Sequence, residues 1–390
     1  MTVLPIRQGG WHHQGARLGA ARASLLLAVS FANDLDGAGL VDVGYSFVQL
    51  AVTHDGGKSW QAVGGLLPGF PASPSSSIAP SQSIAWTSPT GGYAWDSTEL
   101  LQISDGGRHW RRIPSPTALA TPTLTFVSAL GDTLWASFDC RSSTSGCAKP
   151  LWSWNAGSGW QAIPIPVGSA GAFVTDIVRT SAGTDLVLID TIADGDLADT
   201  GGSLLESRDG GSAWTRRPVP CGSLTVRGSH GNSEMTPGAG SVALASAGQD
   251  SGTTIALECL GGGGAGFQAL SFWSLSSMAP GNIWHLQSDN LAGYSGGRLP
   301  DVSSAPRSGY AADLAQTPGT LWLALGRSVP YRSTDDGRIW HEVPAMVSAG
   351  AGGGGSIDFV DPEHGWCLYH GVGLWSTSDG GQTWRLLPSS

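Results

Sequence analysis

The sequence predicts an all-β fold, and three observations support this prediction. The 390 residues include 58 Gly and 23 Pro, the two weakest helix formers. Apolar runs of strand length alternate with short turns, as in "SIDFVDPEHGWCLYHGVGLWS", which ends at residue 376; this alternation is typical of consecutive strands. Five closely similar octapeptides recur along the chain, so the fold repeats one small unit.

The octapeptides follow the pattern Ser/Thr-x-Asp-x-Gly-x-x-Trp, with glycine at the fourth position in most copies. They read "THDGGKSW" from residue 53, "ISDGGRHW" from 103, "SRDGGSAW" from 207, "STDDGRIW" from 333 and "TSDGGQTW" from 377. Two degenerate copies, "SWNAGSGW" from 153 and "SMAPGNIW" from 277, carry Asn155 and Ala279 in place of the aspartate. The seven aspartate positions are 44 to 70 residues apart, a spacing that accommodates four short strands.

Each octapeptide follows three strand-like runs and precedes a fourth that ends in proline, as in "WRRIP" and "WHEVP". A four-stranded antiparallel unit repeated around a ring is a blade of a β-propeller. We therefore predict a β-propeller of seven blades. An eight-bladed ring is the alternative, because residues 220–310 also read as including two strands of an additional small blade. The last copy supplies its own fourth strand at 384–388, so we expect the ring to close without a strand from the N-terminus.

The propeller is expected to span residues 24–390, and residues 1–23 to be a leader or flexible segment. The run "RASLLLAVSFA" at 22–32 is interpreted as the first strand. Its alternative is a signal peptide, with Ser30 and Ala32 at the cleavage site. No run approaches the roughly 20 apolar residues of a transmembrane helix.

The formal net charge is −10, and the only lysines are Lys58 and Lys149. No basic stripe is present, which argues against nucleic acid and anionic membranes as partners. We expect a monomer that binds a glycan or a protein.

Among the five cysteines, Cys140 and Cys147 bracket a short loop and form a candidate disulfide. Cys221 and Cys259 are a second candidate pair, whereas Cys367 lies in an apolar run. Disulfides indicate an oxidising compartment, so we favour an extracytoplasmic location; free thiols in a reducing cytosol are the alternative.

Every octapeptide residue has a structural role in the turn between the third and fourth strands. The aspartate accepts turn N–H groups, glycine supplies the positive φ, and the tryptophan packs at the start of the fourth strand. We assign this structural role to Asp55, Asp105, Asp209, Asp335 and Asp379, and to Trp60, Trp110, Trp160, Trp214, Trp340 and Trp384.

These octapeptides resemble the Asp-box, also called the bacterial neuraminidase repeat, over residues 24–388. The resemblance extends to sialidases, xyloglucan-cleaving glycosidases, sortilin-type receptors and photosystem II assembly factors. It implies a β-propeller with the Asp-boxes away from the functional face, and it implies no particular activity. Ile103 departs from the Ser/Thr position, and two copies lack the aspartate, so we expect those turns to be held differently.

Successive turns of a blade alternate between the two faces of the ring. The long loops all fall on the face opposite the octapeptides, and scaffolds place function on such loops. There we select Phe70, Phe173 and Asn232 as candidate ligand-binding residues. Asp190, Asp194, Asp196 and Asp199 are candidate calcium ligands, since calcium prefers several carboxylate oxygens; a solvated acidic turn is the alternative. We expect no other cofactor.

The principal expectation for function is a non-catalytic binding or assembly protein. The alternative is a glycoside hydrolase, either sialidase-like or using two carboxylates. For that enzyme Glu234, Asp194 and Asp196 are the candidate catalytic residues. Arg112, Ile113 and Pro114 match a sialidase motif, but here they follow an octapeptide and belong to the fourth strand of the repeat.

Overall fold

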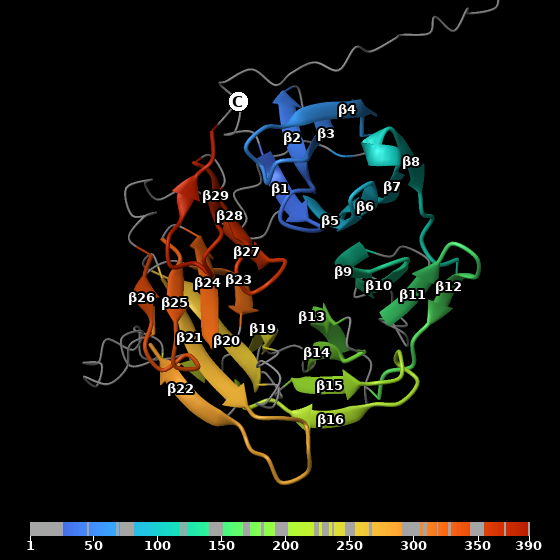
Figure 1. Cartoon of the computed structure of the whole chain (residues 1–390). Helices are drawn as coiled ribbons and strands as arrows, with labels where there is room; N and C mark the ends of the chain where they lie inside the picture. The colour runs from blue at the N-terminus through green and yellow to red at the C-terminus, as the bar shows by residue number, and fades with distance from the viewer. Residues whose placement is uncertain are drawn as a thin grey trace, which may run out of the picture.

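The computed structural model contains seven four-stranded antiparallel sheets arranged as blades around a central axis (Figure 1). It describes residues 26–388 with the exception of 45–46, 68–69, 71–81, 118, 120–122, 140–150, 167–171, 181–182, 192–201, 222–225, 228–233, 236–237, 246–253, 265–266, 291–304, 307–309, 318, 327–328, 344–354 and 370–371. In every blade the first strand in the sequence lies nearest the axis and the fourth lies at the rim (Figure 1).

The first four blades contain sixteen strands. These are β1 (Leu26–Phe31), β2 (Gly37–Gly44), β3 (Phe47–Thr53) and β4 (Gln61–Leu66); β5 (Gln82–Ser88), β6 (Gly91–Asp96), β7 (Leu100–Ser104) and β8 (His109–Arg112); β9 (Thr123–Leu130), β10 (Thr133–Asp139), β11 (Leu151–Asn155) and β12 (Gly159–Ala162); and β13 (Ala172–Arg179), β14 (Asp185–Thr191), β15 (Ser203–Ser207) and β16 (Thr215–Pro218).

The last three blades follow a two-stranded hairpin, β17 (Val226–Arg227) and β18 (Glu234–Met235). They comprise β19 (Gly238–Ala245), β20 (Thr254–Gly264), β21 (Phe267–Leu275) and β22 (His285–Asp289); β23 (Tyr310–Thr317), β24 (Thr320–Gly326), β25 (Tyr331–Ser333) and β26 (His341–Glu342); and β27 (Gly355–Phe359), β28 (Gly365–Tyr369), β29 (Gly373–Thr377) and β30 (Arg385–Leu386).

The region 220–310 therefore supplies one blade and a small hairpin, and the ring has seven blades. The seven-bladed prediction is confirmed because β19 to β22 form a single sheet. Residues 26–31, which the sequence also allowed as part of a signal peptide, form the innermost strand of blade 1.

The hydrophobic core is divided among the interfaces between neighbouring blades, as the alternation of side chains along strands requires. Between blades 4 and 5, for example, Leu188 and Leu257 are both fully buried in one cluster. The Cys221–Cys259 disulfide joins the same two blades, with 5.4 Å between the Cα atoms. This confirms the second predicted pair, whereas Cys140 and Cys147 lie outside the described residues.

The ring closes by packing between blades 1 and 7. Phe31 of β1 stacks on Trp366 of β28, with 3.7 Å between ring centroids, and Trp366 Nε1 donates to the carbonyl oxygen of Gly56 at 3.0 Å. Among the residues that the structure describes, the sheet of blade 7 consists of its own strands, β27 to β30. The expectation that no N-terminal strand completes the last blade is confirmed.

The octapeptide turns have the internal hydrogen bonds expected from their sequence. In blade 4 the Ser207 hydroxyl donates to Asp209 Oδ1 at 2.8 Å and accepts the N–H of Gly211 at 2.8 Å. The same carboxylate oxygen accepts the N–H of Ala213 at 2.9 Å. Equivalent contacts hold the copies that begin at residues 53, 333 and 377.

The octapeptide turns share a face with the turns between the first and second strands, as predicted. The N–H groups of Gly56, Gly106 and Gly380 donate to carbonyl oxygens of the neighbouring turn at 2.8 to 2.9 Å. Gly56 and Gly380 have φ values of +73° and +66°, which favour glycine strongly over residues with a side chain.

The three atypical copies are held differently. In the copy at 277, Arg217 of β16 donates to the carbonyl oxygens of Ala279, at 2.8 Å, and of Asn282. In the copy at 153, Asn155 Oδ1 accepts the N–H of Gly157 at 2.8 Å. In the copy with Ile103, residues Asp105–Gly107 form a 3₁₀ turn whose N-cap residue, Ser104, makes no side-chain capping hydrogen bond.

Candidate functional site

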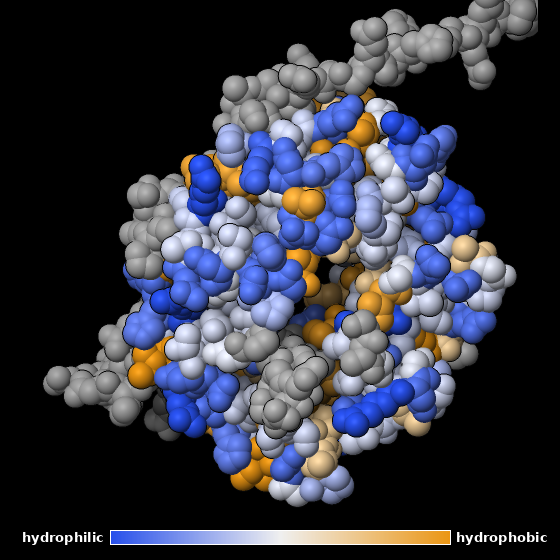
Figure 2. Space-filling view, in the orientation of Figure 1, coloured by the Kyte–Doolittle hydropathy of each residue, from blue (hydrophilic) through white to orange (hydrophobic). Residues whose placement is uncertain are grey.

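A cavity of about 340 Å³ lies on the axis of the ring. Figure 2 shows the molecule hollowed at its centre, where the innermost strands of the blades meet. The lining residues come from β1 (Val29, Ser30, Phe31), β5 (Ile84), β13 (Val178), β23 (Asp313, Leu314, Ala315, Gln316), β27 (Ser356, Ile357, Asp358, Phe359) and β28 (Trp366).

Two carboxyl groups, Asp313 of β23 and Asp358 of β27, lie on neighbouring inner strands of the cavity wall. Asp313 Oδ2 accepts the N–H of Ile357 at 2.9 Å, which connects blade 6 to blade 7. Asp358 Oδ1 accepts the N–H of Phe359 at 2.8 Å, and its side chain is open to the cavity although it lies deep within the ring. Each carboxyl group is therefore held by a backbone N–H group, and both line the same cavity.

The surroundings disfavour ionisation of these carboxyl groups. Removal from bulk water, together with Asp358 and Asp176 nearby, raises the pKa of Asp313 to about 7, despite the hydrogen bond from the N–H of Ile357. Desolvation also raises the pKa of Asp358. The cause in each case is chiefly the cost of placing charge where solvation is poor.

Glu258 of β20 lies behind this wall with only 1% of its surface exposed. Leu257 and Cys259 pack toward blade 4, so Glu258 points to the other face of its sheet, toward blade 6. Burial, followed by the charges of Asp313 and Asp176, raises its pKa to about 8. Its Oε1 atom has no hydrogen-bond partner among the residues that the structure describes.

The wall has further acceptor capacity. Gln316 of β23 lines the cavity, and its Oε1 atom is buried without a partner in the described part of the chain. The Ser30 hydroxyl accepts the N–H of Trp86 at 2.9 Å. No lysine or arginine is among the described lining residues.

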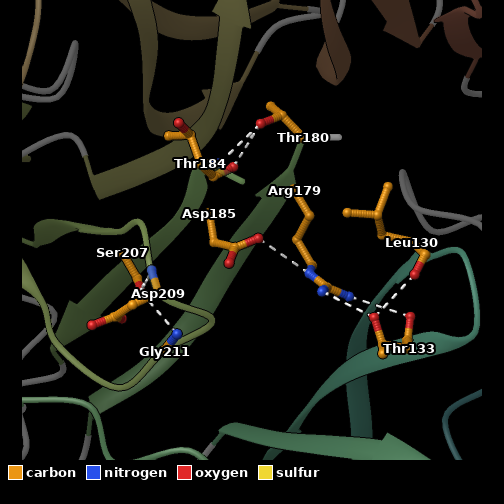
Figure 3. A network of polar contacts seen from close by, with 9 residues as sticks. All are labelled: Leu130, Thr133, Arg179, Thr180, Thr184, Asp185, Ser207, Asp209 and Gly211. Carbon is orange, nitrogen blue, oxygen red and sulfur yellow. Dashed lines mark hydrogen bonds and ion pairs between the residues drawn. The ribbon is translucent and has the colours of Figure 1, made fainter. Parts of the chain in front are cut away.

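Arg179, which follows the lining residue Val178 in β13, is buried and engaged between blades 3 and 4 (Figure 3). Arg179 of β13 donates to Asp185 Oδ1 at 3.3 Å, to the Thr133 carbonyl oxygen at 3.2 Å and to Thr133 Oγ1 at 3.1 Å. Its guanidinium also lies over the Trp135 ring, 4.6 Å from the centroid. A sialidase is expected to hold the carboxylate of its substrate with three arginines. The described lining of this cavity contains none.

The aromatic rings of the wall contact other rings. Phe31 stacks on Trp366, and Phe359 packs against Trp322 and Trp384 with centroid distances of 5.4 and 5.9 Å. These faces are occupied by protein and do not form an open platform for a sugar ring.

Phe70 and Phe173, the two candidate ligand-binding residues whose side chains the structure describes, are not among the residues that line this cavity. Phe70 is 2% exposed and packs in the core between blades 1 and 2, so its ring is not presented on the surface. Phe173 lies in β13 and is partly buried. Glu234 lies in β18 and Asp190 in β14, but their side chains are outside the described part.

The remaining candidates, Asn232, Asp194, Asp196 and Asp199, fall in segments outside the described residues. Their roles as ligand-binding, catalytic or calcium-binding residues stay predictions. Within the described ranges, no group of three or more His, Cys, Asp or Glu side chains has metal-binding geometry. No helix in those ranges is long and apolar enough to cross a membrane.

Sequence reasoning missed Asp313, Asp358, Gln316 and Glu258 because each was read as one residue of a strand. A signal was present: "SIDF" and "ADLAQ" place carboxyl and amide groups within inner strands. Without the closed ring, nothing in the sequence indicates that these strands face one axis.

Comparisons with known proteins support the fold. No protein-family model matches the sequence. The chain is similar to a probable oligoxyloglucan-reducing end-specific xyloglucanase of Neosartorya fischeri, at 27% identity over 133 residues. These residues are 30% of this chain but only 15% of that protein.

Two solved structures resemble the chain over nearly its whole length. YCF48 bound to D1 peptide has a TM-score of 0.54 and 19% identity, covering 94% of this chain and 96% of that one. YCF48 from Cyanidioschyzon merolae has a TM-score of 0.54 and 17% identity, covering 95% and 99%. At these identities the likeness establishes the fold, so the chain is a seven-bladed β-propeller protein.

Proposed function

We propose that this propeller is a non-catalytic binding protein that takes up a segment of a protein partner at its axial cavity. The observation that carries the proposal is a cavity of about 340 Å³ on the axis whose wall combines fixed backbone-bonded carboxyl groups with apolar side chains. Concave sites of this size with a few placed polar groups are typical of ligand pockets.

The similarity to YCF48, which has been solved with a D1 peptide bound, is consistent with peptide binding by this architecture. The ligand does not transfer with the fold, because propellers bind many kinds of partner. A contribution from the long-loop face stays part of the proposal, with Phe173 and Asn232 as its candidate residues.

A glycoside hydrolase is the second candidate function. Asp313 and Asp358 share the cavity, and the raised pKa of Asp313 is a property of a general acid. The local similarity to a xyloglucanase points the same way. Against it, the Phe31 and Phe359 rings are already packed against other aromatic rings of the protein.

The test is selection of binders from a random peptide library on the full chain and on two variants. Val178→Trp places an indole at the cavity wall, and Ile283→Trp adds the same group at a rim turn, where Ile283 is 64% exposed. We expect peptides that bind the parent and Ile283→Trp but not Val178→Trp. Recovery of the same peptides on all three proteins contradicts the proposal. So does an activity that releases sugar from xyloglucan oligosaccharides and is abolished by Asp313→Asn.

A further inference from the structure

The polar groups of the axial cavity are unbalanced. Asp313, Asp358 and Gln316 present acceptor oxygens, and no cationic side chain is found among the described lining residues. Buried acceptors are normally paired with donors. Here Gln316 Oε1 is buried without a partner, and so is Glu258 Oε1 next to the Asp313 carboxyl. The described lining of the cavity therefore has carboxyl and amide acceptors and no positively charged side chain.

We propose that the axial cavity binds a cationic side chain, a lysine or arginine of the partner segment, between Asp313 and Asp358. This inference rests on the proposed function and names the ligand chemistry of the same site. A guanidinium has five N–H donors and a permanent charge, which suits two carboxylates and an amide oxygen on different inner strands. An ammonium supplies the same charge with three donors.

Several features favour a side chain over a free metal ion. Calcium needs six to eight oxygens at about 2.3 to 2.6 Å, and the acidic groups of the described residues are not gathered in that way. Asp313 Oδ2 and Asp358 Oδ1 already accept backbone N–H groups, so each carboxylate has its second oxygen to offer. A long side chain reaches both carboxylates from the cavity mouth.

Binding is expected to be coupled to proton release. Asp313 is faced by acidic groups on four elements: Asp176 of β13, Glu258 of β20, Asp358 of β27 and the Cys367 thiol of β28. Their proximity and poor solvation keep Asp313 partly protonated near neutral pH, since its pKa is raised to about 7. A cation favours the ionised form, so its affinity rises as pH rises through that value.

The experiment uses the full chain and the acetylated, amidated pentapeptide Gly-Gly-Arg-Gly-Gly. Its citrulline analogue has nearly the same shape without the charge. Titration calorimetry at pH 8 is expected to show binding that is at least about 10-fold weaker for the citrulline peptide. We expect a similar loss for Asp313→Asn and for Asp358→Asn, because each removes one carboxylate while keeping an acceptor for the backbone N–H.

Asp34→Asn is the matched control, because it removes the same charge at an exposed turn residue that is not among those lining the cavity. It is expected to leave the affinity unchanged, which separates the cavity from the general attraction of a chain of net charge −10. The affinity of the parent is expected to be about 10-fold lower at pH 5.5 than at pH 8. In Asp313→Asn that pH dependence is expected to shrink.

Equal affinity for the arginine and citrulline peptides overturns the inference. So does an effect of Asp34→Asn as large as that of Asp313→Asn. Thermal unfolding of each variant at pH 8 shows whether a lost signal reflects lost folding, and Asp358→Asn is the second variant if Asp313→Asn unfolds. If the peptide library yields neutral peptides that bind the parent but not Val178→Trp, the proposed function is supported and only the cationic ligand is refuted.

Discussion

Trp214 Nε1 donates a hydrogen bond to the carbonyl oxygen of Pro164 at 2.9 Å. The donor belongs to the octapeptide of blade 4, and the acceptor is the proline after the fourth strand of blade 3. The same bond joins Trp160 to Pro114 at 2.6 Å and Trp284 to Pro218 at 3.0 Å. In these three copies the octapeptide tryptophan therefore bonds to the proline that ends the preceding blade, whereas Trp60 and Trp340 donate to a glycine of their own octapeptide.

Trp214→Phe is expected to lower the free energy of unfolding by about 1 kcal/mol, because the ring is largely kept and the hydrogen bond is lost. Urea unfolding followed by circular dichroism measures the change. The matched control is Trp110→Phe, since Trp110 is 39% exposed. If both variants lose the same stability, the bond to Pro164 contributes nothing specific.

Asp335→Ala is expected to destabilise the protein by about 1 to 3 kcal/mol, because turn N–H groups lose their acceptor. Asp335 Oδ1 accepts from the Ser333 hydroxyl at 2.7 Å and from the N–H of Ile339 at 2.9 Å. Although partial burial opposes ionisation, these hydrogen bonds lower the pKa of Asp335 below 3.8. Its stabilising effect is therefore present above about pH 4 and lost as pH falls further.

The measurement is urea unfolding at pH 7 and at pH 3. Asp335→Ala should differ from the parent more at pH 7 than at pH 3. Asp335→Asn keeps an acceptor oxygen and should lose less stability at pH 7. A difference that is the same at both pH values contradicts the assigned role.

Asp336→Gly is expected to raise the free energy of unfolding by about 0.5 kcal/mol, because residues with a Cβ are disfavoured in the left-handed region. Asp336 has a φ of +60°, whereas Gly210 and Gly380 occupy the same octapeptide position with φ of +70° and +66°. Differential scanning calorimetry detects the gain. Asp132→Gly, at an exposed turn position without positive φ, should lower stability instead; a decrease in both variants refutes the prediction.

Glu258→Gln is expected to flatten the dependence of stability on pH. The carboxyl is 1% exposed, and burial raises its pKa from 4.5 to about 8. The folded state therefore binds more protons than the unfolded state between these values, so the stabilising effect of the protonated form is lost as pH rises through about 8. At pH 8.5 the variant should be more stable than the parent by roughly 1 to 3 kcal/mol, and at pH 5 the two should be similar.

Chemical unfolding across pH 5 to 8.5 provides the comparison. Glu363→Gln, in the exposed turn between β27 and β28, is the control and should follow the parent. Parallel pH profiles for Glu258→Gln and the parent are the result that argues against a protonated Glu258.

Most of the fold was predictable because the repeat is local. Asp209, Gly211 and Trp214 lie within one octapeptide, and their hydrogen bonds follow from residue type and spacing. The sequence predicted seven blades but left an eighth open in residues 220–310, and the structure excluded it. The turn of "SMAPGNIW" was not predictable, because it lacks the aspartate and Arg217 from the preceding blade bonds to it instead. A contact over about 60 residues leaves no local signature.

The candidate site was not predictable in the same way. Phe70, Asn232 and Glu234 were selected because they lie in long loops, but loop length says nothing about where a side chain points. Asp313 and Asp358 are separated by a blade-length of sequence and meet only because β23 and β27 are neighbouring inner strands.

The sequence by itself determined the unit of this protein: a four-stranded sheet, closed by a turn whose aspartate, glycine and tryptophan interact within eight residues. Only the tertiary structure decided the number of blades, the pairing of Cys221 with Cys259 and the joining of Phe31 to Trp366. It also gathered the carboxyl groups on the axis. Turn chemistry acts between near neighbours in the chain, whereas ring closure and the pKa values along the axis depend on strands that the sequence keeps far apart.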